Sequence, residues 1–312
     1  MAKTVRRRTK QKFWSRYHKD EVATAYLFIL PLMIGVTYFY LIPMAQTLFY
    51  SLTKWGQFGG FKFIGFDNFK RLASDPDLLG AIRNTCVYTI FAVPGGILLS
   101  ILIAALLNTK IRGRGLYRVI YFLPSVTMAT AIAMVWRWMF NSNFGIINQA
   151  LSVVGIKGPA WITDPRWAMF ALIIVGIWSS LGTQIIIFLA GLQGIPQALY
   201  EAAELDGAGT ARKFFSITLP MLTPTIFFSS ITQIIGALQI YDLIYLMFSS
   251  DNPALRSVQS LSFLFYRQAF VFNDKGYGAA IVVVLLAITL LITVVQFSFQ
   301  KRWVYYSSVA TD

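Results

Sequence analysis

The stretch Glu201-Ala202-Ala203-Glu204-Leu205-Asp206-Gly207, followed after nine residues by Ile217-Thr218-Leu219-Pro220, lies between two hydrophobic segments long enough to cross a bilayer. A charged segment in that position must serve a partner outside the lipid. Pro196 suits the first turn of a helix, whose N–H groups have no intrahelical acceptor, and Gly207 suits the left-handed residue that ends one. The sequence therefore predicts a short helix from Pro196 to Asp206.

A second short helix is expected from Arg212 to Ile217, with Thr210 as its cap and Pro220 preventing smooth continuation into the next span. On the first helix, two faces follow from spacings of three and four residues. The polar face carries Gln197, Glu201 and Glu204, and the apolar stripe carries Leu199, Ala202 and Ala203. One face can pack while the other presents carboxylates.

This segment resembles the EAA loop in the membrane subunits of binding-protein-dependent ABC importers. The pattern of that loop is Glu-Ala-Ala, three residues, Gly, nine residues, Ile, one residue and Leu-Pro. Every fixed position is filled here, by Glu201, Ala202, Ala203, Gly207, Ile217, Leu219 and Pro220. The resemblance implies that these residues, together with Asp206, form a coupling helix that docks into a cleft on a cytoplasmic ATPase subunit and transmits its closing motion. The alternative is a solvated amphipathic connection between two spans.

Composition places the chain in a membrane, because 56% of its residues are hydrophobic, 13% are charged and its mean hydropathy is +0.61. Soluble domains carry about 25% charged residues. Six stretches reach the roughly 20 residues that a helix needs to cross hydrocarbon. They are Ala23–Ser51, Asn84–Asn108, Arg118–Phe140, Trp167–Leu192, Leu222–Phe248 and Ala279–Phe299. We expect an all-α membrane protein, and the resemblance implies a six-helix bundle of the type I ABC importer permease kind.

Basic residues near the span ends predict the orientation, since lysine and arginine are kept on the cytoplasmic side. The first 19 residues hold eight of them and no acidic residue, and the second-to-third connection adds Lys110, Arg112, Arg114 and Arg118. Both termini and the coupling loop, residues 193–221, are therefore expected in the cytoplasm. The predicted organisation is a basic tail over residues 1–22, a permease domain over 23–299 and a C-terminal tail over 300–312.

Other features exclude function classes. The net charge of +14 is concentrated in the tail and loops that flank the membrane, where it suits lipid headgroups, and no nucleic-acid-binding signature accompanies it. His18 and Cys86 are each the sole residue of their type, so neither a histidine cluster for a metal nor an internal disulfide is expected. The chain has no Gly-x-x-x-x-Gly-Lys-Ser/Thr sequence that would cradle ATP, and we predict that it binds no cofactor.

The connections on the other side also resemble those of carbohydrate-uptake permeases. Gly65-Phe66-Asp67-Asn68-Phe69 precedes the second predicted span, which Asn84 is expected to cap. Pro94 and Pro124 are expected to kink their helices. One departure is Asp251-Asn252-Pro253, where the family often has Gly-Gly-Pro, and this weakens inference about how that loop contacts a binding protein.

Ionisable groups inside a span usually face a cavity or a partner helix. Asp242 lies inside the fifth predicted span beside Gln239 and Tyr241, with Gln233 two turns earlier. A ring beside carboxylate and amide groups suits sugars, so these four residues form the predicted substrate path; the alternative for Asp242 is a structural hydrogen bond or a helix end reached by water. Trp178 and Gln184 are weaker candidates. Arg137, flanked by tryptophans, is interpreted as an interfacial anchor.

Together these features predict the permease subunit of an ATP-driven ABC importer in a bacterial or archaeal cytoplasmic membrane, translocating a sugar. The resemblance implies as partners a second homologous permease, two ATPase subunits that use ATP and Mg, and an extracytoplasmic binding protein. A stand-alone carrier or channel is the rival hypothesis, although no inverted repeat with matching broken helices is seen. A membrane scaffold that recruits a cytoplasmic protein is a third.

Overall fold

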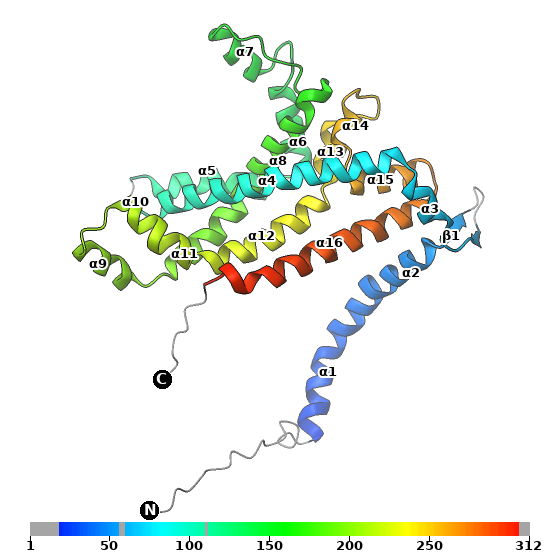
Figure 1. The fold of residues 1–312 in the computed structure, drawn as a ribbon, viewed down its shortest axis with the longest axis horizontal. Coiled ribbons are helices and arrows are strands. Elements are labelled where there is room, and N and C mark those ends of the chain that lie inside the picture. The colour runs from blue at the N-terminus through cyan, green and yellow to red at the C-terminus, as the bar shows by residue number, and fades with distance from the viewer. Residues whose placement is uncertain (1–18, 56–59, 110–111, 306–312) are drawn as a thin grey trace, which may run out of the picture. The chain divides into compact units, whose positions relative to one another are not determined.

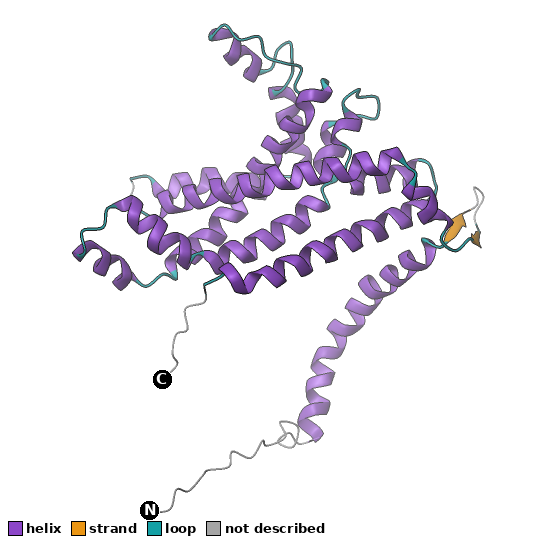
Figure 2. Cartoon of the chain, in the orientation of Figure 1, coloured by secondary structure: helices purple, strands orange, loops and turns teal. Residues whose placement is uncertain are grey.

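The computed structural model describes residues 19–55, 60–109 and 112–305 (Figure 1). Most of the predicted basic tail and the last seven residues, 306–312, lie outside the described residues, as do Lys110 and the side chain of Arg114. The chain divides into two compact units, residues 1–49 and 50–312. Helices make up most of the described chain (Figure 2), which confirms the predicted all-α class.

The described part of the first unit is a helical rod in three segments, α1 (Lys19–Val36), η2 (Thr37–Leu41) and α2 (Ile42–Tyr50), the last of which ends one residue inside the second unit. The η2 segment is a π-helix in which the Ile42 N–H donates to the Thr37 carbonyl, five residues back. It lies directly before Pro43, which has no N–H and cannot continue the regular ladder. The rod from Val22 to Tyr50 is apolar and long enough to cross a membrane, as predicted.

A short antiparallel hairpin, which the sequence analysis did not predict, opens the second unit. Strand β1 (Thr53–Trp55) pairs with β2 (Phe61–Phe63) in the register Thr53↔Phe63. A short helix, α3 (Asp67–Ala73), follows the hairpin. Asn68 fastens the two elements together, because its buried amide donates to the carbonyls of Ser51 at 2.8 Å and Thr53 at 2.9 Å.

The second predicted span starts earlier than expected. Helix α4 runs from Pro76 to Asn108, a length of about 50 Å at the standard rise. Asp75 caps it by accepting from the Asp77 N–H at 2.8 Å, so the prediction that Asn84 is the cap was wrong. Asn84 lies inside the helix, and its amide donates to the carbonyls of Arg256 and Gln259. This residue therefore connects α4 to the last polar connection of the chain.

The third predicted span is broken. Helices α5 (Arg114–Val126) and α6 (Ala129–Met139) meet at an angle of 104°, so the kink expected at Pro124 is a full break, and it lies just after that proline. Pro124 removes one backbone donor, and the Thr127 hydroxyl donates to the Leu123 carbonyl at 2.8 Å. The Leu123 carbonyl is thus satisfied without further helix, and the chain turns.

Helix α8 forms the centre of the main core. It follows α7 (Ile146–Val153) and runs from Pro165 to Gln193, close to the predicted fourth span. It packs against α4, α5 and α12. A Cβ at Gly176 would lie 2.1 Å from the Tyr88 hydroxyl oxygen, so glycine leaves room on α8 for the Tyr88 side chain of α4. Large buried residues of this core include Leu172, Phe188, Leu222 and Ile244.

The fifth predicted span is also interrupted. Helix α12 (Thr223–Leu238) ends before Gln239, and a separate helix α13 begins at Asp242 and ends at Met247. The Ser260 hydroxyl donates to the Ile240 carbonyl at 2.5 Å in the gap. A continuous helix over 222–248 was therefore wrong, and Asp242 lies in the first turn of a helix rather than in the middle of one.

The last part of the chain forms α14 (Leu255–Val258), α15 (Leu261–Tyr266), the π-helix η4 (Arg267–Val271) and α16 (Lys275–Trp303). A second core joins α16 to α3 and α15 around Leu264, Tyr277 and Ile281. Ion pairs Arg71–Asp274, at 2.7 Å, and Arg256–Asp77, at 2.8 Å, fasten the same end of the bundle.

Four helices in the described chain are long and apolar enough to span a membrane, or up to six if each bent pair counts as one span. The two bent pairs are α5 with α6, and the run from Thr210 to Met221 with α12. In Figure 1, α9 lies at one end of the long helices of the second unit, while α3, β1 and α15 lie at the other. The long helices therefore separate two polar ends.

Candidate functional site

The charged loop forms the two-helix structure that the sequence predicted. Helix α9 runs from Gln197 to Leu205, and Pro196 precedes it as the N-cap residue. Gly207 has φ +71°, the left-handed conformation expected for it. The Gly207 N–H donates to the Glu204 carbonyl at 3.0 Å and the Ala208 N–H to the Ala203 carbonyl at 2.8 Å. These two bonds define a Schellman cap, which ends α9 and reverses the chain.

The second helix of the loop is longer than expected. It begins with α10 (Thr210–Lys213), passes through the π-helix η3 (Phe214–Thr218) and continues as α11 (Leu219–Met221). Gly209, not Thr210, holds the N-cap position, so the Thr210 cap was wrong. Pro220 lies within this run, and the 63° bend into α12 comes after Met221. The break before the fifth span is therefore real but lies past Pro220.

Two side-chain contacts hold the loop helices together. The Lys213 ammonium lies 2.7 Å from the Glu204 carboxylate, and the Tyr200 hydroxyl lies 2.9 Å from the hydroxyl of Thr218. Tyr200, Phe214 and Ile217 pack against the main core, whereas the predicted stripe of Leu199 and Ala202 is exposed. The loop is therefore attached to the bundle through its aromatic residues.

The outer surface of the loop offers charge and apolar area together. Glu201 and Asp206 are exposed, and neither forms an ion pair with another residue in the described ranges. Leu205 is 91% exposed and Phe215 is 66% exposed. Large apolar side chains at a polar end of the chain, beside unpaired carboxylates, are typical of a protein interaction surface.

The four main substrate-path candidates come together in one cavity of about 320 Å³ between α4, α8, α12 and α13. Gln233 projects from α12, Gln239 and Tyr241 lie in the gap after it, and Asp242 opens α13. Asp242 and Gln239 line the cavity and are exposed. The arrangement combines one carboxylate, two amides and one phenol ring, which are groups that recognise hydroxyl-rich solutes.

Gln184 and Trp178 lie elsewhere and do not line this cavity. Gln184 is 6% exposed, and its side-chain oxygen accepts from the Ser229 hydroxyl, which links α8 to α12. Trp178 contacts Trp136 edge to face, with ring centroids 5.7 Å apart. The first contact joins α8 to α12 and the second joins α8 to α6.

Sequence reasoning missed three polar residues of the cavity, Tyr88 on α4 and the pair Ser179 and Ser180 on α8. The adjacent serines inside an apolar span are a signal that was available, but Tyr88 carried none. Arg137, interpreted as an interfacial anchor, lines two further cavities. No group of three or more potential metal-ligating His, Cys, Asp or Glu residues occurs within the described ranges.

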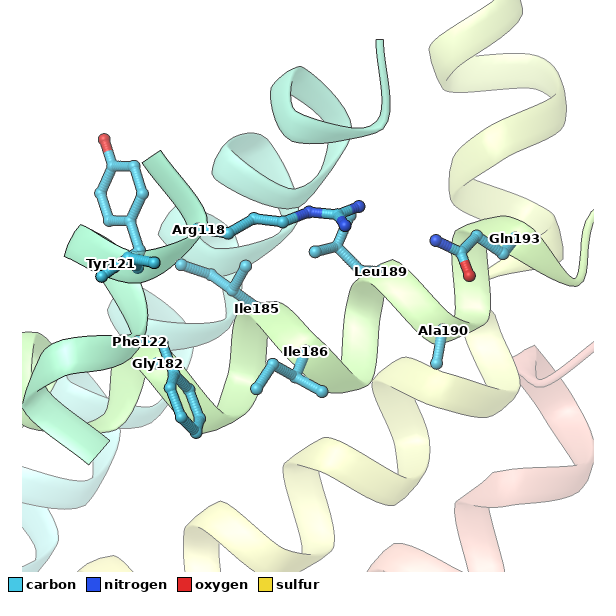
Figure 3. Close-up of a pocket in the computed structure, with 10 residues that line it drawn as sticks. Arg118, Tyr121, Phe122, Gly182, Ile185, Ile186, Leu189, Ala190 and Gln193 are labelled. Carbon is cyan, nitrogen blue, oxygen red and sulfur yellow. The ribbon is translucent and has the colours of Figure 1, made fainter. Parts of the chain in front are cut away.

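Another cavity, of about 420 Å³, lies between α5 and α8 (Figure 3). Ile185, Ile186 and Leu189 form most of one wall, and the polar groups are chiefly Arg118 and Gln193. Such an aliphatic wall suits apolar contacts more than recognition of hydroxyl groups. The 320 Å³ cavity is therefore the better candidate for a solute.

These features, apolar helices around a polar cavity and an exposed charged loop at one end, define a helical membrane transport protein. Residues 96–305 match the family described as "Binding-protein-dependent transport system inner membrane component", and the chain belongs to that family. This confirms the family predicted from the loop.

Similar proteins agree with this assignment. The probable ABC transporter permease protein YesP of Bacillus subtilis is 37% identical, over 93% of this chain and 94% of that protein. The lactose transport system permease protein LacF of Rhizobium radiobacter is 34% identical, over 87% of this chain and 92% of that protein. A chain of a bacterial alginate ABC transporter, solved in complex with an alginate pentasaccharide-bound periplasmic protein, has a similar fold, with a TM-score of 0.80, 24% identity, and coverage of 91% and 96%.

Proposed function

We propose that this chain is the permease subunit of an ATP-driven importer that moves a saccharide, delivered by an extracytoplasmic binding protein, across a bacterial or archaeal cytoplasmic membrane. The observation that carries the proposal is the loop over residues 193–221, with Glu201, Leu205 and Asp206 exposed at the end of the bundle away from α3. The lactose permease named above supports a saccharide as solute.

In this proposal each bent pair counts as one span, which gives six spans with both termini in the cytoplasm. The distribution of basic residues supports that orientation, because Arg112 and Arg118 flank the connection before α5 and Lys301 and Arg302 lie in the last turn of α16. The 193–221 loop then faces the cytoplasm.

The coupling mechanism rests on contacts within the loop. Helix α9 docks on an ATPase subunit, with Leu205 as an apolar anchor and the Glu201 and Asp206 carboxylates facing basic groups of that subunit. The Lys213–Glu204 ion pair and the Tyr200–Thr218 hydrogen bond connect α9 to the run that leads into α12. Movement of α9 therefore displaces the start of α12, whose other end borders the cavity.

The roles of the remaining motif residues follow from their positions. Ala202 and Ala203 keep α9 narrow, and Gly207 permits the chain reversal after Asp206. Ile217 packs against the main core, while Leu219 and Pro220 continue the run toward the bend. ATP and Mg are bound by two partner ATPase subunits in this scheme, and a second, homologous permease completes the pathway.

The solute passes through the cavity that Gln233, Gln239, Tyr241 and Asp242 line. The carboxylate of Asp242 accepts hydrogen bonds from sugar hydroxyls, the amides donate and accept, and the Tyr241 ring contacts the C–H face. In this scheme Gln184 and Trp178 support the helices that form the walls and do not touch the solute.

Reconstitution tests the proposal. The chain is placed in proteoliposomes with its partner permease, ATPase subunits and binding protein, and saccharide uptake is measured with and without ATP. We expect uptake only with the ATPase and ATP, and we expect Glu201→Lys and Gly207→Pro each to abolish it. Lys301→Glu, an exposed charge reversal in the last turn of α16, is the matched control and should retain uptake. Uptake by the chain alone, or unchanged uptake in both loop variants, would contradict the coupling role.

A further inference from the structure

A larger cavity, of about 690 Å³, lies between α6, α13, α15 and η4. Its volume falls within the range of small-molecule sites, roughly 300–1,000 Å³. Nothing in the sequence analysis placed a site here. Its walls combine aromatic rings with two arginines, Arg137 from α6 and Arg267 from η4, and the rest of its lining is mostly apolar.

The aromatic residues form a connected group that joins this cavity to the smaller one. Tyr241, which lines the smaller cavity, stacks on Tyr245 of the larger one, with ring centroids 5.5 Å apart and planes at 20°. Tyr266 contacts both, at 5.2 Å from Tyr241 and 5.3 Å from Tyr245. Rings with hydroxyl groups suit the two faces of a sugar.

The two arginines have only neutral partners. Arg267 donates to the side-chain oxygen of Gln259, and Arg137 lies 3.5 Å from the Leu246 carbonyl oxygen. Neither forms an ion pair in the described part of the chain, whereas Arg71 and Arg256 at the same end are each paired with an aspartate. Arg267 is half-buried and Arg137 is exposed, and neither has a counter-ion among the described residues. A guanidinium binds carboxylates and phosphates well because its donors form a planar fork.

The charges also differ between the two cavities. Asp242 places a carboxylate in the smaller cavity, while the larger one is lined by the two guanidiniums and no carboxylate. An anionic group on a sugar is therefore attracted to the larger cavity and repelled from the smaller one. In the smaller cavity, Asp242 accepts hydrogen bonds from hydroxyl groups instead. The two cavities together would orient a sugar that carries its negative charge at one end.

We infer that the cavity between α6, α13, α15 and η4 is a solute site that selects an acidic saccharide, a sugar bearing a carboxylate or phosphate, through Arg137 and Arg267. The inference rests on the proposed transport function and names its substrate class. Tyr245 and Tyr266 hold the ring, and the two guanidiniums hold the anionic group.

Equilibrium dialysis on the assembled transporter in lipid nanodiscs, without its binding protein, tests the inference. The probes are radiolabelled digalacturonate and galactose 6-phosphate, each compared with its neutral counterpart, galactobiose and galactose. At least one acidic probe should bind about tenfold more tightly than its neutral counterpart, the size of one charge-assisted hydrogen bond. The probe that shows the preference identifies the anion as carboxylate or phosphate. Equal or weaker binding of both acidic probes would overturn the inference.

Variants assign the preference to the arginines. Arg267→Gln and Arg137→Gln should each lower the ratio of acidic-probe to neutral-probe affinity toward one, and Arg267→Lys should retain part of the preference. Arg256→Gln, which removes an exposed arginine paired with Asp77, is the control and should leave it unchanged. If the Arg256 variant loses the preference as strongly as the others, the site assignment is wrong. ATP-driven uptake measured on the same preparation separates failure of the inference from failure of the proposed function. If uptake is intact but acidic probes are not preferred, only the inference is overturned. If no saccharide is taken up, the proposed function is overturned.

Discussion

Replacing Gly207 tests how the backbone of the loop supports coupling. Gly207 has φ +71°, and nothing lies within 4 Å of the position that a Cβ would occupy. An L-residue in the left-handed region costs about 1–2 kcal/mol because its Cβ crowds the following carbonyl. The cost of Gly207→Ala is therefore a backbone cost, with no steric contribution from neighbours.

That cost shifts the equilibrium between the capped loop and conformations in which α9 is released by roughly 5- to 30-fold. Asparagine tolerates the left-handed region better than alanine, and a β-branched residue tolerates it worst. We therefore expect the amount of saccharide transported per ATP hydrolysed to decrease least in Gly207→Asn, more in Gly207→Ala and most in Gly207→Val. The loop lies at one end of the bundle, so the thermal unfolding midpoint should change little (Figure 1).

The assay measures uptake and ATP hydrolysis together in proteoliposomes. Gly209 gives a matched control two residues away, because it has φ −68° and ψ 167°, ordinary for any residue, and a Cβ there also meets nothing within 4 Å. Gly209→Ala should keep wild-type coupling. The reasoning is refuted if the alanines at 207 and 209 have the same effect, or if valine at 207 is harmless.

Two further substitutions test the packing that supports the site. Ser229→Ala leaves the buried side-chain oxygen of Gln184 without its partner and should reduce the free energy of unfolding by about 1–3 kcal/mol, measured by thermal unfolding. A double variant that adds Gln184→Leu should recover most of the loss. A single variant with unchanged stability would show that the bond contributes nothing. Gly276→Ala would place its Cβ 1.9 Å from the Thr53 carbonyl oxygen, so the yield of monodisperse protein should drop sharply. Gly80→Ala, with nothing within 4 Å of its Cβ, should keep that yield, and equal yields from both variants would argue against the packing of α16 on the hairpin.

The spans could be located from sequence because length and apolar composition are visible in it, and Pro124 indicated a bend in the third span, but the positions at which the helices end could not be predicted. Helix α5 ends at Val126 and helix α12 at Leu238. What ends them is the supply of alternative hydrogen-bond partners for the carbonyls. At Ile240 that partner is Ser260, 20 residues further along the chain, and no local pattern reports it.

The candidate site divides in the same way. The loop was predictable because its signals are local, with a proline before the helix and a glycine in the left-handed conformation after it. The cavity was predictable only where its residues are close in sequence, at Gln233 and Gln239 to Asp242. Tyr88 comes from a different helix, and its place in the cavity depends on the close packing of α4 against α8.

Cross-linking from the tip of the loop tests the central claim most directly. Cys86, the single native cysteine, is replaced by alanine, and one cysteine is introduced at Leu205, which is 91% exposed, or at Phe272 as the control. Phe272 lies between η4 and the start of α16, the helix that packs against α3 and β1. The account predicts that Leu205→Cys links to the ATPase subunit of the assembled transporter, that nucleotide changes the yield, and that Phe272→Cys does not link to it. Labelling of Leu205→Cys in intact cells by a membrane-impermeant maleimide, with no link to the ATPase, would contradict it.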